Sequence, residues 1–183
     1  MRTTPLNLTM LALDKDARAD LLAAMPTLGV APDATTLTLG ELIDLGRKAR
    51  PAIGEMDGWT ILVDTLFAVP DQAEVVHAAT RGRNGYAFLW QAASGSHGFG
   101  SHHDGATARA AFRSGDAWMI DQGEPLSEEA GLPWDDDPEA ALTELASRLT
   151  GLDLADTGIW EIPLTPLRKS PRGQQRMGKM LGR

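Results

Sequence analysis

The chain has no cysteine, so its histidines are the first candidates for metal binding or catalysis. Imidazole serves both as a metal ligand and as a general base. Three of the four histidines stand close together, at His97, His102 and His103. The Asp104-Gly105 pair that follows predicts the type I′ turn of a β-hairpin, and neighbouring side chains of a strand point to opposite faces. His102 and His103 should therefore diverge, and His97 lies about 20 Å from His103 along the strand. We expect neither a metal site nor a cofactor.

The segment Ser94-Gly95-Ser96-His97-Gly98 sets serine beside histidine, the residue pair of many hydrolases. A nucleophile elbow needs Gly-x-Ser-x-Gly between a strand and a helix. Here Ser94 stands in place of the first glycine, and a strand is expected to follow. The glycine order also fails the pattern of a dinucleotide-binding loop. We therefore interpret the segment as a glycine-rich turn.

Asp64 is the carboxylate with the most unusual setting, because it lies in the apolar run from Trp59 to Phe67, which predicts an interior strand. Partial burial would shift its pKa and suit it to acid–base catalysis. The alternative is an ion pair with Arg81 or Arg83. If the chain is an enzyme, the first catalytic suspects are Asp64, His97, His103 and Arg109.

Trp134 stands between a proline and the aspartate run Asp135-Asp136-Asp137. An aromatic anchor ringed by charge is typical of a protein–protein interface. The alternative is that the aspartates cap a helix that begins at Pro138 and keep the loop soluble. The predicted partner-binding residues are Trp134, Glu128, Glu129, Asp135 and Asp136.

Charge is distributed unevenly along the chain. All 25 acidic residues lie at or before Glu161, whereas six of the 17 basic residues follow Thr165. The body therefore carries a net charge of −14 and the C-terminal tail +6. An acidic body repels phosphate, which argues against nucleic acid as a ligand except through the tail. The acidic body favours a protein partner with a basic surface, because electrostatic steering would raise the rate of their association.

Residues 165–183 are expected to form a flexible basic tail, because prolines and glycines recur there and little apolar surface is available for burial. Two methionines and a leucine among its basic residues predict a docking peptide or, alternatively, a segment that associates with the acidic body. The docking residues would be Arg176, Met177, Lys179, Met180 and Leu181.

Two of the expected helices carry clear boundary signals. Thr38 and Glu41 have the spacing of a capping box, and a later helix begins at Asp137-Pro138 and ends at Gly151. Apolar periodicity predicts helices over residues 14–25, 38–50, 70–79 and 138–150. It predicts strands over residues 59–67, 86–90, 97–103, 106–113, 117–121 and 160–164. The strand over residues 160–164 is expected to be a short edge strand.

This order of elements predicts an α+β fold, an antiparallel meander sheet of about four to five strands with helices packed on one face. The length of 183 residues suits one compact domain over residues 1–164, followed by the tail. No stretch resembles a signal peptide or a membrane span, and the lack of cysteine fits a reducing compartment. We therefore expect a cytoplasmic protein that does not engage membranes.

The central order of elements resembles an uncharacterised bacterial domain family of unknown function. The resemblance covers about half of the chain and implies no activity, cofactor or catalytic residue. It is carried by the Gly58-Trp59 strand, a short helix, the Arg81-Gly82 turn, an aromatic strand, the Asp104-Gly105 hairpin, and the Asp137-Pro138 helix that ends in Leu149-Thr150-Gly151.

Three functions remain open at this point. The leading hypothesis is a non-enzymatic protein-binding module of the immunity, inhibitor or adaptor type, which presents an acidic surface to a partner. The first alternative is a small hydrolase or transferase that uses scattered polar residues. The second is an assembly component tethered through its C-terminal tail. Two catalytic suspects gathered in one cleft would favour the enzyme.

Overall fold

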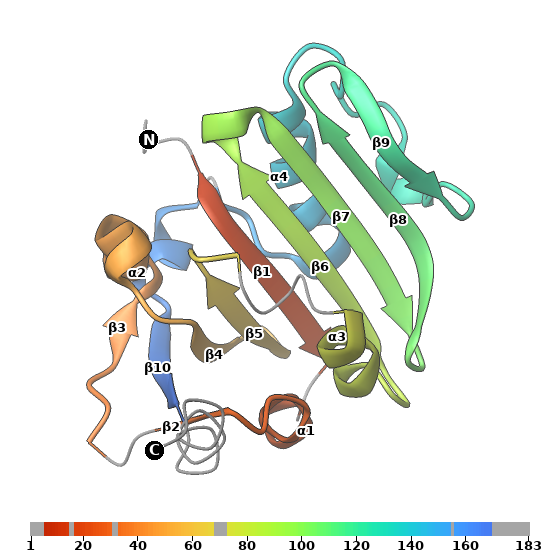
Figure 1. Cartoon of the computed structure of the whole chain (residues 1–183). Helices are drawn as coiled ribbons and strands as arrows, with labels where there is room; N and C mark the ends of the chain where they lie inside the picture. Colours follow the sequence, from red (N-terminus) through yellow and green to blue (C-terminus); the bar gives the residue numbers. More distant parts are fainter. Residues whose placement is uncertain (1–5, 15–16, 31–32, 68–72, 155, 170–183) are drawn as a thin grey trace, which may run out of the picture.

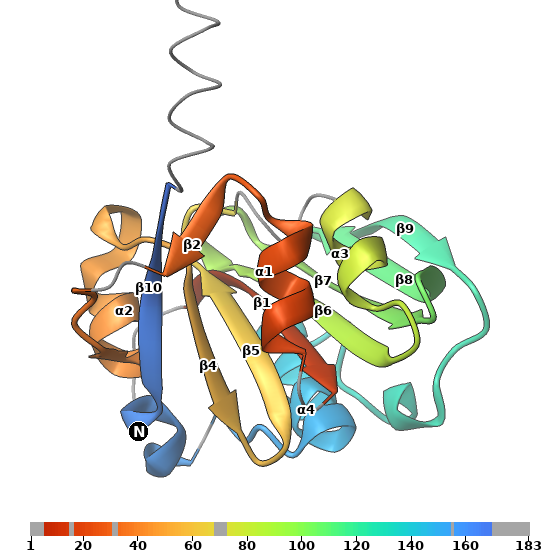
Figure 2. The same cartoon turned by 90° about the horizontal axis from the view of Figure 1, so that it is seen from below.

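The computed structural model describes residues 6–14, 17–30, 33–67, 73–154 and 156–169. Within these residues, ten β-strands form one antiparallel sheet with four α-helices distributed over both faces (Figures 1 and 2). The expectation of four to five strands with helices on one face is therefore wrong. The meander over the later strands exists, but it forms only part of a larger sheet.

The strands are β1 (Asn7–Asp14), β2 (Leu28–Val30), β3 (Leu37–Thr38), β4 (Ala52–Met56), β5 (Trp59–Asp64), β6 (Asn84–Gln91), β7 (Ser96–His103), β8 (Ala106–Ser114), β9 (Ala117–Gln122) and β10 (Pro163–Lys169). The α-helices are α1 (Arg18–Ala24), α2 (Leu39–Leu45), α3 (Ala73–Ala79) and α4 (Pro138–Thr150). Short 3₁₀ segments are η1 (Gly46–Lys48), η2 (Ala92–Ser94), η3 (Ser127–Glu129) and η4 (Thr157–Glu161). The sheet order is β2-β10-β4-β5-β1-β6-β7-β8-β9, and β3 also pairs with β10.

The central strand β1 is buried on both of its faces. Leu8 and Met10 belong to one hydrophobic core, and Leu11 and Leu13 belong to a second core on the other side of the sheet. Because both faces are covered, the strand shows no alternation of apolar and polar residues. This is why sequence periodicity did not reveal it.

Helices enclose the two cores from opposite sides (Figure 2). The first core takes Leu42 from α2 and Leu142 and Leu145 from α4. The second takes Leu21 from α1 and Val76 from α3, and these two helices contact each other. The molecule is therefore a three-layer arrangement, because a sheet buried on both faces needs cover on each side.

Several local predictions are confirmed. Thr38 and Glu41 form the capping box of α2 by exchanging hydrogen bonds between side chain and backbone. Asp137 caps α4 by accepting from the Ala140 amide at 3.0 Å. Asp104 and Gly105 both have positive φ, at 47° and 75°, as a type I′ hairpin turn requires. Such signals depend on neighbouring residues and can be read without the tertiary fold.

The strand β10 lies inside the sheet, between β4 on one side and β2 and β3 on the other. It continues to Lys169, beyond the expected start of the tail, and Leu167 is buried in the second core. Gly54 allows β10 to approach β4, because a Cβ there would lie 2.7 Å from the Pro163 carbonyl oxygen. The predicted edge strand over 160–164 is thus an interior strand that begins later, and the docking residues proposed in the tail lie outside the described residues.

Candidate functional site

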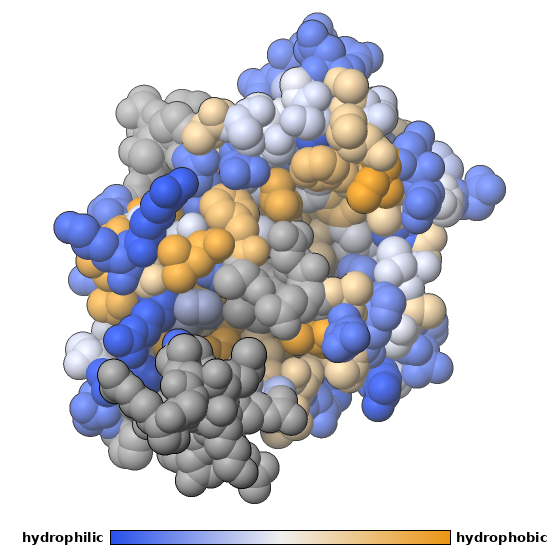
Figure 3. Space-filling model, viewed as in Figure 1, coloured by the Kyte–Doolittle hydropathy of each residue, from blue (hydrophilic) through white to orange (hydrophobic). Residues whose placement is uncertain are grey.

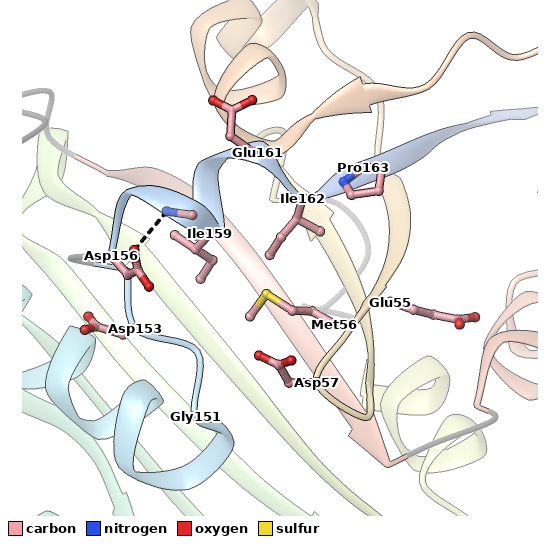
Figure 4. Close-up of a pocket in the computed structure, with 11 residues that line it drawn as sticks. Glu55, Met56, Asp57, Gly151, Asp153, Asp156, Ile159, Glu161, Ile162 and Pro163 are labelled. Atoms are coloured by element: carbon pink, nitrogen blue, oxygen red, sulfur yellow. Dashed lines mark hydrogen bonds between the residues drawn. The ribbon is translucent and has the colours of Figure 1, made fainter.

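An open hollow of about 540 Å³ lies where the β4–β5 turn, the end of α4 and η4 meet (Figure 4). Five of its lining residues are acidic, and none is basic. The carboxylates of Asp57, Asp153 and Asp156 gather around the hollow, whereas Glu55 and Glu161 point outward from its rim. The hollow therefore concentrates negative charge from two regions that are far apart in the sequence, the β4–β5 turn and residues 153–161.

Each aspartate is held by local backbone geometry. Asp57 and Gly58 form the β4–β5 turn, and both have positive φ, at 45° and 92°. Gly151 ends α4 with a left-handed φ of 75°, which directs the chain toward Asp153. Asp156 starts η4, and its carboxylate accepts a hydrogen bond from the Gly158 amide at 2.9 Å. The rim is therefore built on turns and helix ends.

Apolar side chains form the floor of the hollow. Ile159 and Ile162 are buried, and Met56 is half-buried between the aspartates (Figure 4). The carboxylate-bearing residues are all exposed. An apolar floor with an anionic rim complements a lysine or arginine side chain, whose aliphatic stem favours apolar contact while its head favours carboxylates. The hollow can thus bind a basic side chain, and its open shape suits a protein segment.

Sequence reasoning missed this hollow. The body is acidic as a whole, and the strands β5 to β9 separate Asp57 from Asp153 and Asp156 in the sequence. Three acidic residues after Gly151, at positions 153, 156 and 161, were the only local signal. Nothing in that spacing indicated that the β4–β5 turn would lie beside them.

Arg109, one of the catalytic suspects, is an internal ion-pair partner. It is 4% exposed, and its guanidinium donates to both carboxylate oxygens of Glu129 at 2.9 Å and to Asp121 at 2.5 Å. The hydrogen bonds that Arg109 donates to Glu129 hold the pKa of Arg109 above its ordinary value. Arg109 therefore joins β8 to the η3 segment, and Glu129 is occupied within the molecule.

Trp134 packs against the sheet. Its ring stacks on Phe99 with centroids 6.4 Å apart and meets Trp118 edge-on at 5.4 Å. Its carbonyl accepts a hydrogen bond from the buried Arg113, whose guanidinium also lies 3.7 Å from the exposed Asp135 carboxylate. Asp136 is exposed. In the predicted partner-binding set, Trp134 and Glu129 therefore face inward, and Asp135 and Asp136 are exposed. The fifth member, Glu128, accepts a hydrogen bond from the neighbouring Ser127 hydroxyl.

The other catalytic suspects are not brought together. Asp64 is fully buried and pairs with Thr9 in β1, which places it on the face that carries Leu11 and Leu13. His97 lies opposite Trp90 on the other face. Because opposed residues of an antiparallel pair share a face, Asp64 and His97 are on opposite sides of the sheet. His103 is exposed, and its Nδ1 lies 2.7 Å from the Asn84 side-chain oxygen.

His97 is buried without a hydrogen bond. It is 5% exposed, and neither ring nitrogen has a partner among the described residues. Burial lowers its pKa from the ordinary value of 6.5, and the nearby carboxylates of Glu139 and Asp137 oppose this only in part. Arg113, its cross-strand neighbour, lowers the pKa further. The ring is therefore held neutral beneath the start of α4.

The lowered pKa of His97 predicts acid sensitivity. The unfolded chain binds a proton near pH 6.5 and the folded chain only at lower pH, so stability should fall as the pH drops below about 6.5. His97→Leu should lose part of this dependence and be at least as stable as the wild type at neutral pH. Urea unfolding at pH 7.5 and 5 measures both. His102, whose pKa is lowered to about 4, acts in the same direction, so the difference between the two proteins isolates His97. Equal pH dependence in both would contradict the prediction.

A second open hollow, of about 430 Å³, lies over β6 to β9 on the face that carries α1 and α3. Its lining contains no charged residue. Hydrophobic side chains gather over these strands in Figure 3, and Ile120 of β9 contributes with 42% of its surface exposed. This surface does not complement a basic partner. Neither hollow is lined by any of the four catalytic suspects.

Comparisons with known proteins do not assign the chain. No family model, no curated protein and no solved structure matches it. Among the described residues, no three histidine or acidic side chains are grouped to hold a metal ion, and no helix is both long and apolar enough to cross a bilayer. Function must therefore be argued from the geometry of this chain, and the resemblance to an uncharacterised bacterial family stays an expectation.

Proposed function

We propose that the protein is a non-enzymatic binding module of the immunity, inhibitor or adaptor type, which uses an acidic surface to hold a basic segment of a partner protein. The observation that carries this proposal is the hollow with five acidic lining residues, an apolar floor and no basic lining residue. The partner inserts a lysine or arginine between Asp57, Asp153 and Asp156.

The chemistry of the hollow favours a protein segment over a free metal ion or a phosphate. Phosphate is repelled by the carboxylates. Among the described residues, the carboxylates around the hollow are not grouped to hold a metal ion, and the floor between them is apolar. A basic side chain uses both parts of the site, because its stem covers the floor while its charge meets the rim.

The hollow is a better contact than the surface around Trp134. Trp134 is stacked on Phe99, and Glu129 is bound to Arg109, so neither is available without rearrangement. The enzyme alternative is less favoured, because neither hollow gathers two of its four suspects and Asp64 and His97 lie on opposite faces of the sheet. The tethered-assembly alternative depends on tail residues outside the described part of the chain.

A basic peptide tests the proposal directly. Asp57→Asn with Asp153→Asn should weaken binding of a lysine- and arginine-rich peptide about tenfold or more, mainly by slowing association at low salt. Asparagine tolerates the positive φ of position 57, so the turn is retained. Peptide titration followed by calorimetry, with association rates measured at two salt concentrations, gives both quantities.

A matched variant separates local from global charge effects. Asp116→Asn with Glu124→Gln removes the same charge from exposed residues outside the hollow. This control should keep most of the affinity, because its carboxylates do not contact the peptide. Equal weakening in both variants would show that only net charge matters and would reject the hollow as the binding site. The same pair of variants, used as baits against proteins of the native cell, should differ in retention of the partner.

A further inference from the structure

His77 of α3 and His102 of β7 converge on one oxygen atom. The Nε2 atom of His77 lies 3.1 Å from the hydroxyl oxygen of Thr107, and the Nδ1 atom of His102 lies 3.2 Å from the same oxygen. The two ring centroids are 6.1 Å apart. One nitrogen from each imidazole is therefore directed at a shared point between α3 and the β7–β8 hairpin.

The fold holds this pair in place. His102 and Thr107 are register partners across the hairpin, so their side chains share a face of the sheet. The ring of His102 lies over the backbone of Gly100, where a Cβ would come within 2.7 Å of its Nε2 atom. That contact limits the orientations open to the ring and leaves Nδ1 directed at Thr107.

Hydrogen bonds fasten the end of α3 to the hairpin turn. The Gly105 amide donates to the Thr80 carbonyl at 3.1 Å, and the Asp104 carboxylate accepts from the Gly82 amide at 2.8 Å. His77 lies in the last turn of α3. Its distance from His102 is therefore set by backbone contacts, and the pair is pre-organised.

We propose that His77 and His102 form a two-histidine site for a borderline transition-metal ion such as Zn²⁺. Two imidazoles bound to one ion at about 2.0–2.1 Å place their ring centroids roughly 5–6 Å apart, so a small inward movement from the observed separation completes the site. The Thr107 hydroxyl turns aside, and water fills the remaining positions. Mg²⁺ is excluded because it prefers oxygen ligands.

The arrangement of the two rings suits a weakly held ion. Because no third histidine or acidic residue joins the pair among the described residues, the ion would be exchangeable, and its role would be to fasten α3 to the hairpin.

Calorimetric titration of the tag-free full chain with Zn²⁺ tests the proposal, with Mg²⁺ as the metal control. We expect one Zn²⁺ bound per chain and a higher unfolding temperature in its presence. His77→Gln or His102→Gln should weaken Zn²⁺ binding about tenfold or more, whereas His103→Gln should leave it unchanged. His103 is the matched control because its ring is bound to Asn84 and points away from the pair.

Nuclear magnetic resonance of the histidine rings provides a second readout that does not depend on the stability of a variant. Zn²⁺ should shift the signals of His77 and His102 and leave those of His97 and His103 in place. If His102→Gln does not fold, the loss of Zn²⁺ binding in His77→Gln alone tests the proposal, because the site needs both rings. Absence of Zn²⁺ binding, or equal loss in the His103→Gln variant, would overturn the proposal.

Discussion

Replacing Glu129 with alanine should lower the free energy of unfolding by about 3–5 kcal/mol, the cost of breaking a buried ion pair. Both carboxylate oxygens of Glu129 accept hydrogen bonds from Arg109, which is 4% exposed. Removal of the carboxylate leaves two guanidinium donors of Arg109 without their partner and away from water. Urea-induced unfolding at pH 7 measures the loss of stability. The urea concentration at the midpoint should fall, without a large change in the slope of the free energy of unfolding against urea concentration.

Glu128→Ala is the matched control for this prediction. Its carboxylate accepts a hydrogen bond from the neighbouring Ser127 hydroxyl at 2.9 Å, and this contact is exposed. We expect a change within about 0.5 kcal/mol. If Glu128→Ala and Glu129→Ala have equal effects, the Arg109 pair does not anchor the segment, and Glu129 regains its place as a candidate for contact with a partner.

Leu167→Ala should destabilise the protein by about 2–5 kcal/mol, as expected for a buried leucine that leaves a cavity. Leu167 is 1% exposed and lies in the second core with Leu11 and Leu62. Its amide donates to the Pro51 carbonyl at 2.7 Å, so the backbone of β10 is also held in place. Thermal unfolding followed by circular dichroism measures the effect.

Arg168→Ala serves as the control in the same strand. Arg168 is exposed and pairs with the exposed Asp33 at 3.3 Å, a contact worth at most about 1 kcal/mol. A chain that ends after Leu164 should be less stable than Leu167→Ala, because it loses the remainder of β10 as well. Equal stability of that truncated chain and the full chain would show that residues 165–169 belong to the tail, as the sequence analysis expected.

These predictions also bear on where the acidic charge of the body can act. Asp121 and Glu129 are occupied by Arg109, and Asp20 is occupied by Arg83. Part of the acidic charge of the body is therefore neutralised within the molecule.

Elements with local signals could be predicted from the sequence. The capping box at Thr38, the Asp104-Gly105 turn and the Asp137-Pro138 start of α4 were all recognised, because each depends on residues that are close along the chain. The strands β5 to β9 were also found, since β-branched and aromatic runs or hairpin signals mark them.

Elements without such signals were missed. The strand β1 is apolar on both faces and therefore lacks a period of two, β2 and β3 span three and two residues, and β4 contains Gly54, which weakens its strand character. The sequence also predicted a tail from residue 165, because prolines and glycines recur there and little apolar surface is available for burial. Burial of Leu167 against β4 and β2 overrode that signal.

The charge of the body, the lack of thiol groups and the failure of linear catalytic motifs follow directly from the order of residues. Which charges face each other depends on the fold. Arg109 was a catalytic suspect until the fold paired it with Glu129, and His102 diverged from His103 as predicted but met His77, which no spacing rule connects to it. Such contacts join residues that are distant in the chain, and they are set by how strands and helices bury their apolar faces, which local sequence does not encode.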